Sequence, residues 1–182
     1  KKNNKNINDS EPFKGLFTQG MVCHETYKDQ NGKWLNPTEV EKSSKGETIK
    51  IKDKSIVKVG PSESMSKSKK NTIDPEVMIE KYGADSVRWF ILSDSPPEKD
   101  IQWSENGMTS AYKFIQKFWV LNEQVKETGK TKLVENDREI EVFTNQAINK
   151  INLALDKFRY NVIVAVLIKS SLFEEGTTKL TV

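Results

Sequence analysis

The chain has 182 residues, of which 35% are hydrophobic and 30% are charged, and its formal net charge is +3. This composition favours a folded globular protein over a disordered one. The longest apolar stretch, residues 162–168, is far shorter than the roughly 20 residues that span a bilayer, so we expect no membrane association. The single cysteine, Cys23, cannot form an internal disulfide, and we expect a cytoplasmic protein.

The positive charge is concentrated in the first part of the chain. Residues 1–70 hold 15 lysines against 9 acidic residues, a net +6, whereas residues 71–182 hold 14 basic and 17 acidic residues, a net −3. An anionic partner is therefore expected to bind the first part. Cys23 and His24 are adjacent, but the sequence has no other cysteine or histidine to complete a ligand set, so we predict no metal site.

The N-terminal region predicts a linker followed by strands. Residues 1–11 are polar and aperiodic, as in a linker. Residues 13–22 are apolar and aromatic, which predicts a buried strand, and glycines at 15 and 20 would allow close backbone approach. Residues 24–28 and 33–35 flank Asn31-Gly32, which is a strong hairpin signal.

Two further strands are predicted at residues 48–52 and 55–59, the second ending at Gly60-Pro61. Residues 23–63 therefore indicate a small, exposed antiparallel insert.

A stretch rich in lysine and serine follows, Ser64-Met65-Ser66-Lys67-Ser68-Lys69-Lys70-Asn71. It leads into a helix start, because Asp74 is a good N-cap and Pro75 suits the first helical position. Ammonium groups, hydroxyls and free backbone N–H groups are the donors that hold phosphate. Composition alone leaves two interpretations open, a phosphate-binding loop and a solvated run of charge.

Helical periodicity dominates after this loop. Residues 75–82 predict a short helix closed by Gly83, a second helix begins at Asp85, and residues 100–103 predict a brief strand. Ser104 or Asn106 then caps a long helix. Its predicted apolar stripe comprises Met108, Ala111, Ile115, Phe118 or Trp119, and Val125.

A polar break at residues 127–135 precedes a further helix capped by Asp137. The predicted apolar stripe of that helix comprises Ile140, Phe143, Ala147, Ile151, Leu155 and Phe158. The β-branched side chains of residues 162–168 favour a strand, whereas the place of this segment after an α-hairpin favours a helix. Residues from 176 onward predict a frayed end.

Several stretches, in order along the chain, resemble the class I aminoacyl-tRNA synthetases, and specifically the bacterial leucyl-tRNA synthetases. Residues 64–68 are similar to the KMSKS loop of that family. The other matching stretches are 12–14, 19–22, 73–78, 82–88, 95–97, 102–103 with Gly107, and 158–161. The resemblance covers residues 12 to 168 and marks the chain as a fragment of a larger enzyme.

The resemblance implies a fold that is α/β with an α-helical region. Residues 1–11 would be a linker, and residues 12–71 the end of a Rossmann-like catalytic domain with a small β insert and the KMSKS-type loop. Residues 72–126 would form the α-helical stem-contact-fold region. Residues 127–136 would be a second linker, and residues 137–182 part of the α-helical anticodon-binding bundle. This placement favours a helix for residues 162–168.

The resemblance also implies a reaction, in which leucine and ATP give leucyl-adenylate and the leucyl group is then transferred to tRNA(Leu). The implied ATP-binding residues are Ser64, Met65, Ser66, Lys67 and Ser68, with Lys67 catalytic through contact with the phosphates. Mg²⁺ would accompany ATP, with no metal site in this fragment. The full protein is expected to be monomeric.

The chain departs from the family motif at one position, because Ser64 stands where the motif opens with lysine. Lys69 or Lys70 could then supply that charge, to phosphate or to tRNA. Met65 is expected to anchor the loop, while Ser66 and Ser68 could bond phosphate or brace the turn. Arg88, Trp89, Trp103 and Trp119 could stack on RNA, but their spacing favours core packing.

The chain contains no recognisable HIGH-like stretch, leucine pocket or editing domain, so we expect the isolated piece not to activate leucine. A different interpretation is a non-catalytic nucleotide- or RNA-binding module in which the loop clamps an anion. A third is a flexible loop with a purely regulatory role.

Overall fold

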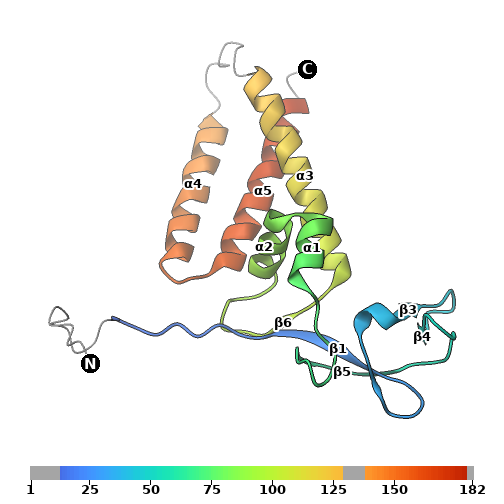
Figure 1. Ribbon diagram of the computed structural model, residues 1–182. Helices are drawn as coiled ribbons and strands as arrows, with labels where there is room; N and C mark the ends of the chain where they lie inside the picture. The colour runs from blue at the N-terminus through green and yellow to red at the C-terminus, as the bar shows by residue number, and fades with distance from the viewer. Residues whose placement is uncertain (1–12, 129–137, 180–182) are drawn as a thin grey trace, which may run out of the picture.

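The computed structural model describes residues 13–128 and 138–179, which form a strand-rich part and a helical part (Figure 1). The four-stranded sheet consists of β1 (Val22–Lys28), β2 (Trp34–Leu35), β5 (Lys58–Ser64) and β6 (Ile101–Gln102). A separate pair consists of β3 (Val40–Lys42) and β4 (Thr48–Lys50), preceded by the 3-10 helix η1 (Pro37–Glu39). The helices are α1 (Pro75–Tyr82), α2 (Ala84–Ser93), α3 (Glu105–Thr128), α4 (Arg138–Leu155) and α5 (Tyr160–Lys179). This mixture agrees with the predicted class.

Strand β1 is the centre of the sheet. It pairs antiparallel with β5 along most of its length, antiparallel with β2 at its C-terminal end, and parallel with β6 at its N-terminal end. The predicted hairpin at Asn31-Gly32 is confirmed, since Tyr27 lies opposite Leu35. Gly32 has a φ of +80°, and the Asp29 carboxylate accepts the Asn31 N–H at 2.9 Å. These contacts form the tight turn that joins β1 to β2.

The predicted end of a strand at Gly60-Pro61 is wrong, because β5 continues to Ser64. The register of β1 against β5 shifts between Glu25 and Thr26, and Pro61 falls at this irregularity. A residue at a bulge needs no ladder donor, so the missing N–H of proline costs no hydrogen bond. The Thr26 hydroxyl donates to the Pro61 carbonyl at 3.2 Å, which secures the bulge.

The predicted buried strand at residues 13–22 is also wrong. Residues 13–21 contain no strand, and β1 begins only at Val22. The apolar side chains of this segment are exposed, Leu16 to 91% and Phe13 to 74%. Figure 1 shows the segment running away from the sheet in an extended path. Gly20 is the one point of close approach that was predicted correctly, since its N–H donates to Pro97 at 2.7 Å and a Cβ there would clash with Lys99.

The helix starts follow the capping residues. The Asp74 carboxylate accepts the Glu76 N–H at 2.9 Å with Pro75 at the first helical position, as predicted. Gly83, at a φ of +81°, closes α1, and α2 begins at Ala84, one residue before the predicted start. Ser104 rather than Asn106 caps α3, because its hydroxyl accepts the Gly107 N–H at 3.1 Å.

Two small cores hold these elements together. Phe90 of α2, Ile101 of β6 and Met108 of α3 are almost fully buried against one another. Tyr27, Leu35 and Val57 form the second core beneath the hairpin. Burial and a hydrogen bond to Glu25 raise the pKa of the Tyr27 hydroxyl. Strand β1 lies between the two cores and links the helices to the hairpin.

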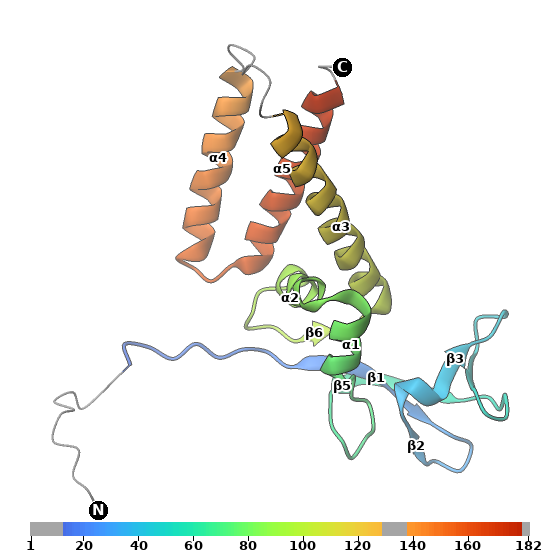
Figure 2. The same cartoon turned by 45° about the horizontal axis from the view of Figure 1, so that its top comes forward.

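The long helices pack with α5 between α3 and α4 (Figure 2). The choice of helix for residues 162–168 is confirmed, and α5 also includes residues 176–179, which were predicted to fray. Trp119 was predicted in the core but is 67% exposed, and Leu121 is buried instead. In α4 and the turn after it, Leu155 and Phe158 are exposed, contrary to the predicted stripe.

The predicted linker at residues 1–11, most of the linker at 127–136 and the cap at Asp137 lie outside the described residues. None of the helices in the described ranges combines the length and the apolar character needed to cross a bilayer.

Candidate functional site

The lysine- and serine-rich loop connects the end of β5 to the start of α1. Ser64 is still a strand residue, paired with Cys23, and its hydroxyl lies 3.9 Å from the cysteine sulfur. Met65 extends the ladder by one bond, its N–H donating to the Val22 carbonyl at 3.1 Å. The loop then projects from the sheet (Figure 2) before Asp74 caps α1. Both ends of the loop are therefore fixed by regular structure.

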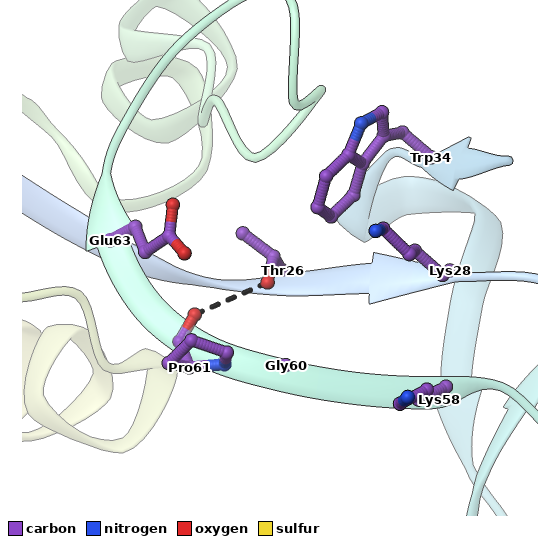
Figure 3. A pocket seen from close by; sticks show the side chains of 7 residues that line it. All are labelled: Thr26, Lys28, Trp34, Lys58, Gly60, Pro61 and Glu63. Atoms are coloured by element: carbon purple, nitrogen blue, oxygen red, sulfur yellow. Dashed lines mark hydrogen bonds between the residues drawn. The ribbon is translucent and has the colours of Figure 1, made fainter. Parts of the chain in front are cut away.

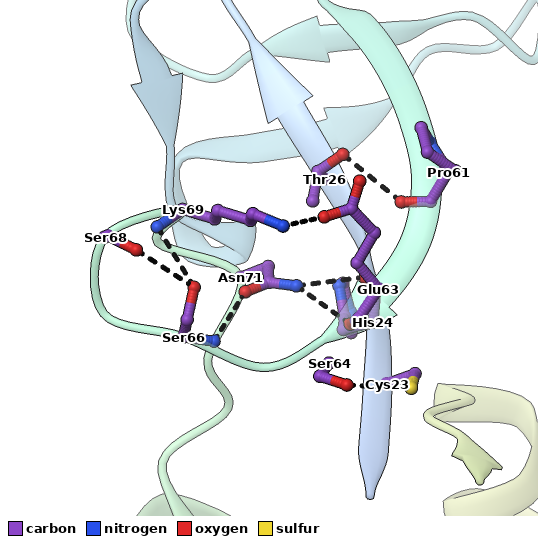
Figure 4. Close-up of polar contacts among 10 residues, drawn as sticks. All are labelled: Cys23, His24, Thr26, Pro61, Glu63, Ser64, Ser66, Ser68, Lys69 and Asn71. Atoms are coloured by element: carbon purple, nitrogen blue, oxygen red, sulfur yellow. Dashed lines mark hydrogen bonds and ion pairs between the residues drawn. The ribbon is translucent and has the colours of Figure 1, made fainter.

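The tip of the loop is a tight turn braced by Ser66. The Lys70 N–H donates to the Lys67 carbonyl at 3.3 Å, and Lys70 has a left-handed φ of +54°. The Ser66 hydroxyl accepts the Lys69 N–H at 3.3 Å and lies 3.2 Å from the Ser68 hydroxyl (Figure 4). Ser66 thus braces the turn, while Ser68 is exposed.

Asn71, the last residue of the lysine- and serine-rich stretch, has no predicted role of its own but lies completely buried at the base of the loop. Its amide oxygen accepts the Ser66 N–H at 2.9 Å. Its amide nitrogen donates to the carbonyls of Glu63 at 3.1 Å and His24 at 3.2 Å (Figure 4). An asparagine before a helix start resembles an ordinary turn residue, so no pattern in a single sequence distinguishes this buried role.

The three lysines of the loop have different surroundings. Lys67 is exposed, and among the residues that the structure describes its ammonium group makes no hydrogen bond or ion pair. The Lys69 ammonium pairs with the Glu63 carboxylate (Figure 4). Lys70 is half-buried; the pKa of Glu39 is lowered mainly by the backbone N–H of Asn36 and, to a smaller extent, by the positive charge of Lys70.

A shallow pocket of about 260 Å³ lies on the sheet beside the loop. The Trp34 ring forms part of its wall, and the Lys28 ammonium lies 4.0 Å from the centroid of that ring (Figure 3). Lys58 and Glu63 also line it. Glu63 therefore connects this pocket to the loop through its ion pair with Lys69.

Cys23 and His24 are neighbours in strand β1. Both side chains are buried in β1, and the His24 ring bonds to the carbonyl of Glu25 at 2.8 Å. Within residues 13–128 and 138–179, no group of acidic, histidine and cysteine side chains is arranged to hold a metal ion.

Among the described residues, the tip of the loop therefore presents an exposed and unpaired cation, Lys67, beside an exposed hydroxyl, Ser68, and the hydrogen bonds of buried Asn71 hold its base. Such an arrangement suits contact with the oxygens of an anionic group, because the ammonium supplies charge while the hydroxyl supplies a directed donor.

Comparisons with known proteins place this loop in a family. Residues 49–104, which include the loop, match the family of class I tRNA synthetases for isoleucine, leucine, methionine and valine (I, L, M and V). A leucine–tRNA ligase of Hyphomonas neptunium is 44% identical over 160 residues, covering 86% of this chain and 19% of the relative. A leucine–tRNA ligase of Azorhizobium caulinodans is 50% identical over 126 residues, covering 69% of this chain and 14% of the relative.

The fold agrees with these relatives. The agnB2 LeuRS of Agrobacterium radiobacter K84, solved as a ternary complex with tRNA and LeuAMS, matches 92% of this chain and 18% of its own length, with a TM-score of 0.62 and 23% identity. The chain thus spans about a fifth of the length of the relatives it matches. From its sequence matches and its fold together, the chain belongs to the leucine–tRNA ligase family of class I tRNA synthetases.

Proposed function

We propose that the full-length protein is a leucine–tRNA ligase, which activates leucine with ATP to leucyl-adenylate and transfers the leucyl group to tRNA(Leu). This chain contributes the loop that contacts the phosphates of ATP. The observation that carries the proposal is the exposed, unpaired ammonium of Lys67 on a loop anchored at both ends, within a region that matches the synthetase family. The names of the relatives supply the amino acid.

In the proposed site, Lys67 is the catalytic residue, and Ser64, Met65, Ser66 and Ser68 complete the ATP-binding loop. The backbone of Ser64 and Met65 continues the sheet ladder, so their contribution is to anchor the loop. Ser68 is the exposed hydroxyl that would donate to a phosphate oxygen. Lys69 and Lys70 would make secondary contacts with phosphate or tRNA.

The chemistry explains why a lysine is needed. Attack by the leucine carboxylate on the α-phosphorus of ATP expels pyrophosphate, and negative charge grows on the leaving group. An enzyme accelerates such a displacement mainly by positioning and by placing positive charge where negative charge develops. Lys67 supplies that charge from the protein, and the Mg²⁺ that accompanies ATP supplies further charge. The phosphates of the nucleotide would hold that Mg²⁺.

The fold supports a division of the chain within the larger enzyme. We propose that residues 12–71 complete a Rossmann-like catalytic domain with a short β insert. Residues 72–126 would form the stem-contact region and residues 137–182 the start of the helical anticodon-binding domain, with a linker at 127–136. The division is supported by helices α1 to α5, which all follow residue 72, and by the strands, of which all but β6 precede residue 65; β6 pairs with β1 across the proposed boundary. We further propose a monomeric protein that works in the cytoplasm, where tRNA charging supplies translation.

The test is the Lys67→Ala variant of the full-length protein. Loss of one well-aimed donor to a transition-state charge typically costs about 3 kcal/mol, which is near a hundredfold in rate. We expect leucine-dependent pyrophosphate–ATP exchange to slow by about this factor while the KM for leucine stays within about twofold. Lys45→Ala, which removes an exposed lysine from the turn between β3 and β4, is the matched control and leaves the rate unchanged.

An unchanged single-turnover rate of adenylate formation in Lys67→Ala would remove Lys67 from the mechanism. A full-length protein that binds nucleotide or RNA but shows no leucine-dependent exchange would instead support the non-catalytic binding module.

A further inference from the structure

We infer that Asn71 is a positioning residue for the ATP-dependent step. Its side-chain amide holds the loop in the position from which Lys67 reaches the phosphates. The inference rests on the proposed function of the loop. It adds a residue that lies outside the five-residue motif and touches neither ATP nor leucine in the proposal.

Asn71 joins three parts of the chain through one side chain. The amide oxygen holds the Ser66 N–H, next to Lys67, and the amide nitrogen holds carbonyls of both β5 and β1 (Figure 4). All three distances lie between 2.9 and 3.2 Å, and the residue is 0% exposed. The amide therefore fixes the start of the loop directly to two neighbouring strands of the sheet.

The other contacts of the loop are weaker restraints. The Lys69–Glu63 pair lies between side chains that are 40% and 34% exposed, where solvent screens an ion pair. The turn also contains Lys70 in a left-handed backbone conformation, which is unfavourable for a residue that has a Cβ. A turn strained in this way keeps its shape only where its surroundings hold it, and Asn71 is the buried group that does so.

The required chemistry is specific to an amide, since the site needs one acceptor and two donor hydrogens at once. In Asn71→Asp the carboxylate still accepts the Ser66 N–H, but it faces the two carbonyls without a proton to donate. In Asn71→Ser a hydroxyl brings one donor and no added charge, and it is too short to reach all three partners. Both variants leave Lys67 and the other motif residues unchanged.

The expected effect is on the chemical step. A displacement of about 1 Å in a catalytic group can cost up to about a hundredfold in rate. We expect both variants of the full-length protein to lower the kcat of leucine-dependent pyrophosphate–ATP exchange by at least about tenfold, with the KM for leucine within about twofold. Asn149→Asp, at an exposed position of α4, adds the same charge elsewhere and leaves kcat unchanged.

A double-mutant cycle separates positioning from general damage to the fold. If Asn71 acts through the loop, Lys67→Ala costs about a hundredfold in the wild type but about tenfold or less in the Asn71→Ser background, because Lys67 is already misplaced. Equal costs of Lys67→Ala in both backgrounds would overturn the inference, as would a wild-type kcat in Asn71→Ser.

The same experiment distinguishes this inference from the proposed function. A wild-type protein without leucine-dependent exchange, or one that is insensitive to Lys67→Ala, contradicts the proposed function. If the wild-type protein shows leucine-dependent exchange that Lys67→Ala slows, but Lys67→Ala has the same cost in the Asn71→Ser background, only the positioning role of Asn71 is contradicted. Should Asn71→Asp fail to fold, Asn71→Ser carries the cycle, and its melting temperature is compared with that of Asn149→Asp.

Discussion

The lysines at positions 67, 69 and 70 carry the same charge, but they differ in exposure and in whether an acidic side chain of the protein pairs with that charge. Lys69 is paired with Glu63, whereas Lys67 is exposed and without such a partner among the described residues. The charge of Lys69, one of the two lysines that could replace the motif's first lysine, is thus less available than that of Lys67. A lysine whose charge is already partly compensated contributes less to an incoming anion.

We therefore expect Lys69→Ala to slow pyrophosphate–ATP exchange by the full-length protein far less than Lys67→Ala. Exposed ion pairs are worth about 0–1 kcal/mol, so the effect stays below about fivefold. Exchange rates of the two variants, measured side by side at saturating leucine, check this order. A slower Lys69→Ala than Lys67→Ala would show that the ion pair with Glu63 opens and that Lys69 is the main phosphate ligand.

At this scale the residue types of the loop were predictable and their partners were not. Lysine, serine and the helix cap at Asp74 are visible in the sequence because they act within a few residues. Glu63 and Asn71 act through partners in other elements: the amide of Asn71 reaches His24, which lies 47 residues earlier. The spacing of a single sequence carries no information on such pairs, so the support beneath the loop emerged only from the fold.

The helices are the elements that local signals predicted best. Asp74 and Ser104 cap α1 and α3, and Gly83 closes α1 with a positive φ. Each signal is a short-range hydrogen bond or a backbone preference, which the local sequence determines. The apolar stripe of α3 was right at Met108 and Ala111 but wrong at Trp119, because the burial pattern changes phase and Leu121 faces the interior.

The strands depended on long-range pairing and were predicted less well. Pro61 was expected to stop a strand, yet a bulge in the pairing with β1 accommodates it. Residues 13–21 have the apolar composition of a buried strand, but they form no strand, and the printed contacts of their backbone lie at the end of the segment, where Gly20 donates to Pro97 and Met21 accepts from Ile101. Composition reports the tendency of a segment to be buried, and it does not report which surface covers it.

The cap of α1 gives a prediction at the scale of one element. Replacing an N-cap aspartate with alanine typically costs about 1 kcal/mol. In Asp74→Ala we expect amide hydrogen exchange in α1 of the full-length protein to become about fivefold faster, since the N–H of Glu76 loses its acceptor. Asp94→Ala, at the C-terminal end of α2, is the control. Unchanged exchange in α1 would mean that packing rather than the cap determines its stability.

Many apolar side chains of the described residues are exposed. Beyond residues 13–21, exposed apolar side chains are spread over the long helices, including Trp119 at 67%, Leu153 at 56% and Val120 at 55%. Such surface on a soluble domain marks contact with other protein segments or a tendency to associate. The chain spans about a fifth of the length of the relatives it matches, and we propose that other parts of the full-length protein cover this surface.

We expect the isolated chain to show no leucine-dependent pyrophosphate–ATP exchange and to associate as its concentration rises. The exposed face of the loop contacts none of the described residues, and we propose that other parts of the full-length protein form the far side of the ATP site. The exposed apolar side chains favour self-association. Exchange assays and sedimentation velocity, with the full-length protein as control, measure the two properties. Clear exchange activity in the isolated chain would contradict the fragment interpretation.

The pairing of Cys23 has a mechanical consequence. On one side this residue lies opposite Ser64, where the loop begins; on the other it lies opposite Gln102, two residues before the cap of α3, and its carbonyl accepts the Trp103 N–H at 2.7 Å. The first residue of the loop and the residues just before α3 are thus both paired with Cys23. We therefore expect a change in the tilt of α3 to move the first residues of the loop as well. The tip of the loop around Lys67 lies outside this pairing and can move independently.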